Sequence, residues 1–263
     1  MNIPKILIVE GNLREENQSF TSGGIKTHTE SLIESIGYFT NKIEIEVVNP
    51  SSDTDLNEKV QQLKKYNGII WGGSSLNIYN DTVEIRRQLE FMKECQKKIK
   101  NILAICWGMQ VAVTVAGGIV KKSENGPHRG IAHHIKINEY GLKHPLYKNK
   151  DPIFNTPAFN FDEVTTLPTG ATLLSSNAIN KVMGIEFKIG ECNIWGIQYH
   201  PEITYDKMIS LIHFRSEKLL KNKAFIDQAE INKHVEVISK ENKIINKDSR
   251  MRELGNWLDI IKK

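Results

Sequence analysis

Cysteine is scarce in this sequence, and its spacing excludes two common uses of the residue. The chain has three cysteines among 263 residues, Cys95, Cys106 and Cys192, and no two of them form a Cys-x-x-Cys pair. A disulfide framework or a structural zinc site is therefore not expected. Because such usage is typical of proteins whose thiols stay reduced, we expect a soluble, cytoplasmic protein.

Long hydrophobic runs and a strong excess of one charge are also missing. No stretch approaches the roughly 20 apolar residues that span a bilayer, and the N-terminal residues lack the pattern of a secretory leader. The 35 basic and 31 acidic residues leave a net charge of +4, which does not predict binding to nucleic acid or to a membrane. The hydrophobic fraction of 40% is typical of a globular protein with a sizeable core.

Short apolar runs alternate with amphipathic segments in the first half of the chain. The runs at residues 5–11, 68–73 and 101–106 contain few polar residues, which predicts strands buried on both faces of a sheet. Residues 83–100, between the last two runs, carry apolar residues at helical spacing. This alternation predicts an α/β fold, with a doubly wound, mostly parallel sheet and flanking helices.

The pattern changes after Ile119. The segments that follow are strand-like, with short polar turns between them, at residues 128–141, 171–177, 182–190 and 192–202. They predict a small antiparallel extension of the sheet, and the last of them is expected to return to its centre. From Thr204 onward the pattern is helical. We therefore expect the α/β domain to span residues 1–215 and a helical C-terminal appendage to span 216–263.

The C-terminal appendage has two parts. Residues 233–250 are polar enough to form a loosely held helix or a linker. The last part carries an apolar stripe at helical spacing, made of Met251, Leu254, Trp257, Leu258 and Ile261. We favour packing of this stripe on its own domain or on a twin subunit, and docking of a partner synthetase is the alternative.

The stretch 101–118 places Cys106 directly after an apolar run and two residues before Gly108. Strand, sharp turn and helix in this order form a nucleophile elbow, which projects a side chain above the edge of the sheet. Gly108 leaves room in the turn, and the N-terminus of the next helix stabilises a thiolate. The alternative is that Cys106 is a buried small hydrophobic residue, and Cys95 and Cys192 are interpreted in that way.

The elbow also predicts where an oxyanion would be stabilised. The backbone N–H of Trp107 faces the oxygen of a carbonyl that Cys106 attacks. A second donor is available in the segment "WGGSS", where Gly72 and Gly73 can expose backbone N–H groups. These glycines belong to the same edge as the elbow, because ligand sites of open α/β sheets lie at the carboxyl ends of the strands.

A cysteine nucleophile needs a base, and residues 194–204 contain a candidate. An apolar strand runs to Tyr199 and is followed by His200, Pro201 and Glu202. Because Pro201 stiffens the backbone, the Glu202 carboxylate could accept a hydrogen bond from one ring nitrogen of His200 while the other faces Cys106. A solvated pair at a strand end is the alternative for this segment alone. Together with the elbow, it predicts a Cys-His-Glu triad.

The chain has eight histidines, and those other than His200 show no metal-binding pattern. His133 and His134 are adjacent, so in a strand they point to opposite faces, and no carboxylate or cysteine accompanies them at ligand spacing. We expect most of these seven histidines, a group that includes His28, to lie at the surface or in packing. Neither a metal ion nor a cofactor is expected.

Several segments together resemble the class I glutamine amidotransferases. The segment "CWGMQ" is similar to the family's Cys-x-Gly-x-Gln signature, and "YHPE" is similar to its His-x-Glu pair. "GIIWGGSS" resembles the family's oxyanion strand and loop, and "FNFDEVTTLPTGATLLSSN" resembles the segment that lies between. The resemblance spans roughly residues 5–220, with the motifs in the family's order.

The resemblance implies a catalytic role for each matching residue. Cys106 would attack the γ-amide of glutamine, and a glutamyl thioester would form and then be hydrolysed by water. His200, oriented by Glu202, would act first as a base and then as the acid that releases ammonia. The backbone N–H groups of Gly73 and Trp107 would form the oxyanion hole.

Substrate binding is implied for three further residues. Gln110 matches the family glutamine that holds the α-amino acid end of the substrate, and Asn160 and Phe161 lie in the segment that cradles the α-carboxylate. The sequence departs from the family there, because Phe159 and Asn160 stand where some members have Ser-His. This departure concerns the identity of the substrate more than catalysis.

Three functions therefore stay open. The first is a stand-alone hydrolase of the γ-amide of glutamine or of a γ-glutamyl amide, and the second is a γ-glutamyl peptidase, which needs an open cleft for its larger leaving group. The third is a regulatory or binding subunit without turnover. The expected partners are a small-molecule substrate and either a separate synthetase subunit or a second copy of the chain, because the appendage is too short for a synthetase domain.

Overall fold

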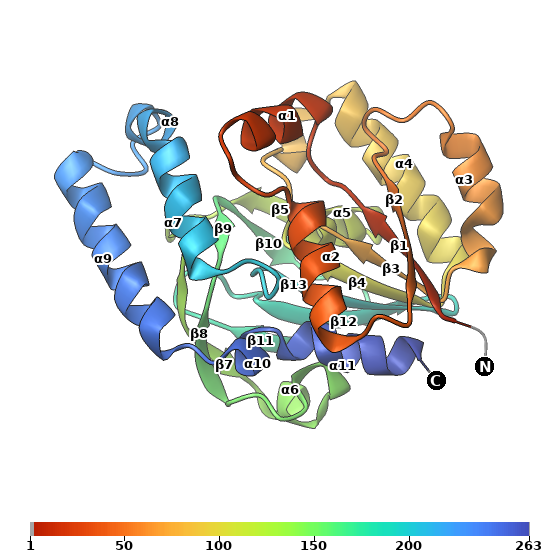
Figure 1. The fold of residues 1–263 in the computed structure, drawn as a ribbon. Helices are drawn as coiled ribbons and strands as arrows, with labels where there is room; N and C mark the ends of the chain where they lie inside the picture. The colour runs from red at the N-terminus through yellow and green to blue at the C-terminus, as the bar shows by residue number, and fades with distance from the viewer. Residues whose placement is uncertain (1–2, 263) are drawn as a thin grey trace.

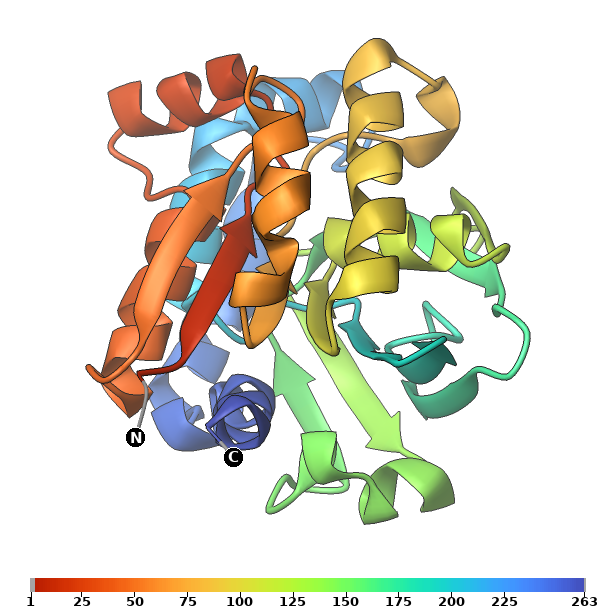
Figure 2. The same ribbon diagram turned by 90° about the vertical axis from the view of Figure 1, so that its right-hand side faces the viewer.

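A nine-stranded sheet forms the centre of the molecule (Figures 1 and 2). The computed structural model describes residues 3–262, so the outermost residues of the two predicted regions, Met1, Asn2 and Lys263, lie outside it. Across the sheet the strands are β2 (Glu44–Val48), β1 (Lys5–Val9), β3 (Gly68–Trp71), β4 (Asn101–Ile105), β13 (Cys192–Ile197), β12 (Gly184–Ile189), β11 (Thr172–Ser176), β7 (Ala132–Ile137) and β8 (Ile153–Thr156). The first five are parallel, and each of the last four is antiparallel to its neighbour. The predicted α/β class with an antiparallel extension is confirmed.

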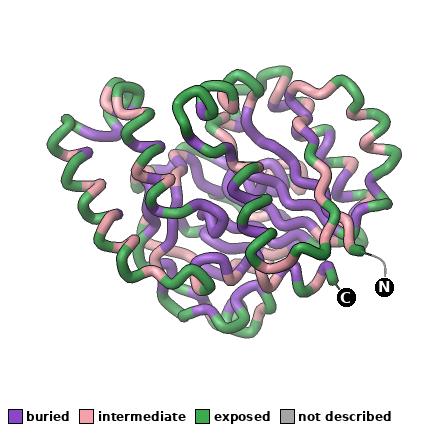
Figure 3. The backbone as a smooth tube through the Cα atoms, viewed as in Figure 1, coloured by how far each residue is buried: buried purple, intermediate pink, exposed green. Residues whose placement is uncertain are grey.

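The apolar strands feed two cores, one on each face of the sheet. Successive side chains of a strand point to opposite faces, so Leu7 and Ile102 belong to one core while Ile8 and Leu103 belong to the other. Figure 3 shows the buried strands between more exposed helices. The first core is covered by α3 (Leu56–Gln62), α4 (Val83–Lys98) and α5 (Trp107–Val115), and the second by α2 (His28–Phe39) and α11 (Arg252–Ile261). Burial on both faces explains why these strands lack polar residues.

The remaining elements lie around this centre. The other helices are α1 (Arg14–Ser22), α6 (Glu139–Lys143), α7 (Tyr205–Phe214), α8 (Ser216–Lys221), α9 (Gln228–Ile244) and α10 (Lys247–Arg250), with 3-10 turns at Leu63–Lys65, Ile78–Asn80 and Pro145–Tyr147. Two small antiparallel sheets pair β5 (Ile119–Lys122) with β10 (Asp162–Thr166) and β6 (His128–Arg129) with β9 (Phe159–Asn160). Within residues 3–262, no helix has the length and apolar character needed to cross a membrane.

The C-terminal helices pack against the rest of the chain. Most of the polar segment predicted as a loose helix or a linker lies in α9, where Ile231 and Ile238 are fully buried beside α7. The apolar stripe of α11 enters the second core, and Trp257 is 1% exposed. The contact is close, because a Cβ atom on Gly68 would lie 2.5 Å from Cδ1 of Ile261. The boundary after residue 215 stays a prediction.

The position of the site follows from the pairing of β4 with β13. The two strands are parallel neighbours, and Ile105 is paired with Ile197 at their ends. Cys106 and the segment from Gln198 to Glu202 therefore leave the sheet side by side at its carboxyl edge.

Candidate active site

Cys106 occupies a sharp turn between a strand and a helix. It follows the last residue of β4 and precedes the first residue of α5, with φ 53° and ψ −104°. A positive φ is strained for a residue with a Cβ atom, and such strain is concentrated at functional sites. Gly108 completes the turn, because a Cβ atom there would lie 2.5 Å from the carbonyl oxygen of Trp71. The backbone therefore has the geometry of a nucleophile elbow.

The sulfur of Cys106 faces a hydrogen-bond donor. The side-chain amide of Gln198 donates from Nε2 to Sγ over 3.4 Å, and its Oε1 accepts from Nε2 of Gln110 over 3.3 Å. Both glutamines are buried. These two hydrogen bonds fix the orientation of the Gln198 amide. Its N–H group therefore stabilises negative charge on the sulfur. Gln198 was not predicted from the sequence, where it is one position within an apolar strand.

His200 and Glu202 form a buried pair next to the cysteine. Nδ1 of His200 lies 2.8 Å from Oε1 of Glu202, and the two residues are 1% and 3% exposed. Burial alone would lower the pKa of His200, but the Glu202 carboxylate and then the Cys106 side chain raise it to about 10. Burial would raise the pKa of Glu202, but the adjacent His200 imidazole holds it well below its usual range. The pair is therefore charged at neutral pH.

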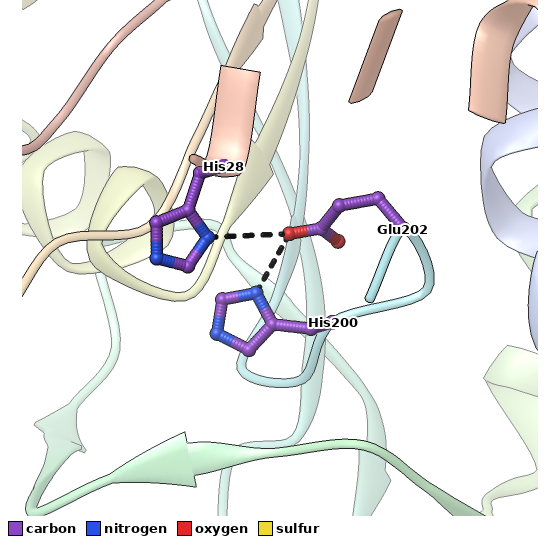
Figure 4. Close-up of side chains that lie close together, drawn as sticks. All are labelled: His28, His200 and Glu202. Carbon is purple, nitrogen blue, oxygen red and sulfur yellow. Dashed lines mark hydrogen bonds and ion pairs between the residues drawn. The ribbon is translucent and has the colours of Figure 1, made fainter. Parts of the chain in front are cut away.

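A second imidazole lies against this pair (Figure 4). His28, the first residue of α2, points Nδ1 toward Oε1 of Glu202, at 3.7 Å. Burial lowers the pKa of His28 to about 4, although Glu202 acts in the opposite direction. His28 is therefore an exception to the expectation that most histidines other than His200 lie at the surface or in packing. The only local signal near it is the capping box formed by Thr27 and Glu30, which marks the start of the helix.

The two backbone groups predicted for the oxyanion hole lie at the same edge. Gly73 packs directly against the imidazole of His200, because a Cβ atom on Gly73 would lie 2.7 Å from Cε1 of that ring. Trp107 begins α5, and its indole Nε1 donates to Oε1 of Gln88 over 2.7 Å, which holds the side chain away from the cleft. In the described part of the chain, the backbone N–H groups of Gly73 and Trp107 donate no hydrogen bond. Their donor capacity is therefore not used within these residues, and their role in an oxyanion hole stays a prediction.

A cleft of about 440 Å³ opens beside Cys106, and it is lined by the three residues predicted to bind substrate, Gln110, Asn160 and Phe161. Its lining also includes polar and charged side chains, namely Asn77, Tyr79, Lys122, Asp162, Arg215, Lys218 and Asn222. A cleft of this volume accommodates a small organic molecule. A larger hollow of about 560 Å³ elsewhere, around Glu10 and Asp53, contains none of the predicted site residues.

The side chain of Asn160 is held within the protein. Its Oδ1 lies 2.9 Å from Nδ1 of His128, and its Nδ2 donates to the backbone carbonyl of Asp162 and to Oδ1 of Asn180. Asn160 therefore fixes the wall of the cleft, and the part of its side chain that remains for a ligand is small. Sequence reasoning placed Asn160 at the site but did not anticipate these three contacts.

One group of residues could offer ligand atoms to a metal ion. Within residues 3–262, only His28, His200 and Glu202 bring three suitable atoms within 4.8 Å of one another. Nδ1 of His200 and Oε1 of Glu202 already satisfy each other by a hydrogen bond. This pairing accounts for the arrangement without an ion, and the absence of a metal site stays a prediction.

The sheet and the cluster at its carboxyl edge define an α/β protein with a thiol and a histidine–carboxylate pair on neighbouring strands. Residues 25–216 match the family model of class I glutamine amidotransferases, and the chain belongs to that family.

Relatives of the chain include hydrolases of γ-glutamyl compounds. A γ-glutamyl-L-1-hydroxyisopropylamide hydrolase from a Pseudomonas species is 32% identical over 206 residues, which cover 76% of this chain and 68% of that protein. γ-Glutamyl peptidase 4 of Arabidopsis thaliana is 28% identical over 58% of this chain and 60% of its own length, which is less than two thirds of that relative. A glutamine-hydrolysing GMP synthase subunit from Saccharolobus solfataricus is 26% identical over 62% of this chain and 78% of its own.

A solved structure shares the fold along the whole chain. A glutamine amidotransferase from Thermotoga maritima covers 100% of both chains with a TM-score of 0.68 and 16% identity. At this level of identity the similarity concerns the fold alone.

Proposed function

We propose that this protein hydrolyses γ-glutamyl amide bonds through a glutamyl thioester on Cys106. The observation that carries the proposal is the strained thiol at the end of β4, next to the buried His200–Glu202 pair and open to a cleft. A nucleophile, a base and a group that orients the base are the three parts that acyl transfer requires.

The charge state of the pair defines the order of proton transfers. Because the pKa of His200 is raised to about 10, the ring carries a proton at neutral pH. The proposed reaction starts with the Cys106 sulfur acting as a thiolate nucleophile beside this ring. The thiolate attacks the γ-carbonyl carbon, a C–S bond forms, and the C–N bond breaks as His200 donates its proton to the leaving amine. Neutral His200 then removes a proton from water, which attacks the thioester. The C–S bond breaks, and glutamate leaves with the thiolate restored.

The remaining predicted residues bind the reacting groups. The backbone N–H groups of Gly73 and Trp107 stabilise the oxyanion that forms in each half of the reaction. Gln110 contacts the α-amino acid end of the substrate from the wall of the cleft. Asn160 and Phe161 shape the opposite wall, and Asn160 acts mainly through the backbone that its side chain holds in place.

The volume of the cleft favours a leaving group larger than ammonia. The cleft extends from Cys106 to Lys218 and Asn222 on and beyond α8, which is more space than glutamine fills. The names of two relatives, a γ-glutamyl amide hydrolase and a γ-glutamyl peptidase, support the same class of substrate. We therefore place γ-glutamyl derivatives of organic amines ahead of glutamine.

A release assay tests this proposal. Glutamine, a γ-glutamyl alkylamide and γ-glutamylcysteine are offered to the purified protein and to its Cys106→Ala variant, and free glutamate is measured. The lining of the cleft also includes Leu76 and Leu219, which can contact the alkyl group of a larger substrate. We therefore expect kcat/KM for the alkylamide to exceed that for glutamine by about tenfold or more. If glutamate is released from glutamine but from neither of the other two compounds, the function is glutamine hydrolysis. No release from any compound would overturn the proposal in favour of a non-catalytic subunit.

A further inference from the structure

The C-terminal segment reaches the loop that carries the His200–Glu202 pair. Arg250, the last residue of α10, is 5% exposed and donates from Nη1 to the backbone carbonyl oxygens of Pro201 and Ile203, the second at 3.0 Å. Pro201 and Ile203 are the residues immediately before and after Glu202. One guanidinium group therefore holds the backbone on both sides of the carboxylate that orients His200.

Within residues 3–262, the charge of Arg250 has no direct ion-pair partner. Among residues 3–262, no carboxylate lies within 4.0 Å of its guanidinium nitrogens. Burying an unpaired cation is costly, and several strong hydrogen bonds are needed to offset that cost. Both contacts of Nη1 go to the catalytic loop, so the buried charge is used to hold that loop. Glu202 also attracts this charge at longer range.

A second contact joins the same segment to the residue before His200. The Tyr199 hydroxyl donates to Oε1 of Glu253 over 2.6 Å, and Glu253 forms an ion pair with Lys150 at 3.1 Å. Lys150 also donates to the backbone carbonyl of Ser249 over 2.6 Å. Glu253 and Lys150 are 0% and 8% exposed. Residues 249–253 are therefore fixed from both sides against the end of β13.

We infer that Arg250 is a positioning residue, which holds the Pro201–Ile203 backbone so that Glu202 keeps His200 directed at Cys106. The role of His200 and Glu202 in turnover rests on the proposed function. The contacts of Arg250 with the loop do not, because they follow from the geometry alone. The C-terminal segment is thus part of the active-site architecture.

The test compares Arg250→Met and Arg250→Lys with Lys243→Met, which removes an exposed cation from α9. Arg250→Met removes both hydrogen bonds, while Arg250→Lys keeps the charge and part of the donor capacity. We expect kcat on the γ-glutamyl alkylamide to fall about 10- to 100-fold in Arg250→Met with KM changed less than about threefold, because small displacements of a catalytic group cost this much. Arg250→Lys should recover part of the loss, and Lys243→Met should match the parent.

A substrate-free measurement separates this inference from the proposed function. The rate of Cys106 alkylation by iodoacetamide is followed against pH, with Cys106→Ala as the blank, since Cys95 and Cys192 are 0% and 1% exposed. In Arg250→Met the pH midpoint of alkylation should rise by about one unit or more, because a displaced imidazolium stabilises the thiolate less. An unchanged midpoint in a folded variant, or an equal loss in Lys243→Met, would overturn the inference. A parent protein that is alkylated normally but hydrolyses nothing would contradict only the proposed function.

Discussion

The imidazole rings of His28 and His200 are stacked, with centroids 5.1 Å apart and ring planes 28° apart. Both point Nδ1 at one oxygen of Glu202, at 3.7 and 2.8 Å. Two adjacent imidazolium ions would repel each other, and the structure avoids this because His28 is neutral while His200 is charged. Once the pH is low enough to protonate His28, its charge repels that of His200. Protonation of His28 therefore destabilises the His200–Glu202 pair in acid.

The first prediction concerns stability in acid. Because burial lowers the pKa of His28 from 6.5 to about 4, the unfolded chain binds more protons between these values than the folded chain does. The contribution of His28 to the free energy of unfolding is complete above pH 6.5 and is lost as the pH falls toward 4. His28→Gln should give a melting temperature that declines less steeply over this range than in the parent. The exposed His213→Gln is the control, and a parallel decline in both variants would contradict the prediction.

The second prediction concerns the strain at Cys106. Cys106→Ala should abolish hydrolysis and leave the fold intact, because the sulfur is the attacking atom. Cys106→Gly should be equally inactive but more stable than the alanine variant by roughly 1 kcal/mol, since glycine adopts a φ of 53° without a Cβ penalty. Urea unfolding of the two variants measures the difference. Equal stability would show that the turn is not strained, and an active alanine variant would remove Cys106 from the mechanism.

The third prediction concerns the carboxylate of Glu202. Glu202→Gln removes the charge that raises the pKa of His200, so the basic limb of the kcat/KM profile should move from near pH 10 to lower pH. Turnover should fall by about 100-fold or more, while Cys106 can still be alkylated. The exposed Glu236→Gln should behave like the parent. A parent-like rate and profile in Glu202→Gln would exclude Glu202 from the triad.

The fourth prediction concerns the space beside His200. In Gly73→Ala the new methyl group would lie 2.7 Å from Cε1 of His200 and 3.0 Å from Cε1 of His28, so the imidazole must move. We expect a fall in kcat of at least about tenfold. Gly37→Ala, in an exposed helical position with no atom within 4 Å of the new methyl group, should keep full activity and gain about 0.5–1 kcal/mol of stability. Equal activity in the two variants would show that Gly73 does not limit the position of His200.

The fold and the elbow could be predicted because their signals are local. Buried parallel strands lack polar residues, and the change from apolar strand through Cys106 to Gly108 marks the turn in the sequence itself. The proximity of Cys106 to His200 follows from the order of strands, since the ends of parallel neighbours share an edge. These parts needed no knowledge of side-chain packing.

His28 and Arg250 could not be predicted, because their roles depend on how helices are placed over the sheet. The capping box shows where α2 begins but not that its first residue stacks on His200. The apolar stripe of α11 predicts a buried helix face, but it does not predict that Arg250, at the end of the preceding helix α10, contacts the catalytic loop. Gln198 was hidden for a similar reason, as one polar residue at the end of an apolar strand.

The register between β4 and β13 has a consequence for how the protein loses activity. Backbone hydrogen bonds join the two strands from Asn101 and Asn193 to Ile105 and Ile197, in the middle of the sheet. Amide protons in such a ladder exchange with solvent only when the whole domain opens, so the distance between the two strand ends does not change in smaller fluctuations. Heat inactivation should therefore coincide with loss of the sheet itself, and the thiol and its imidazole should stay together until that point.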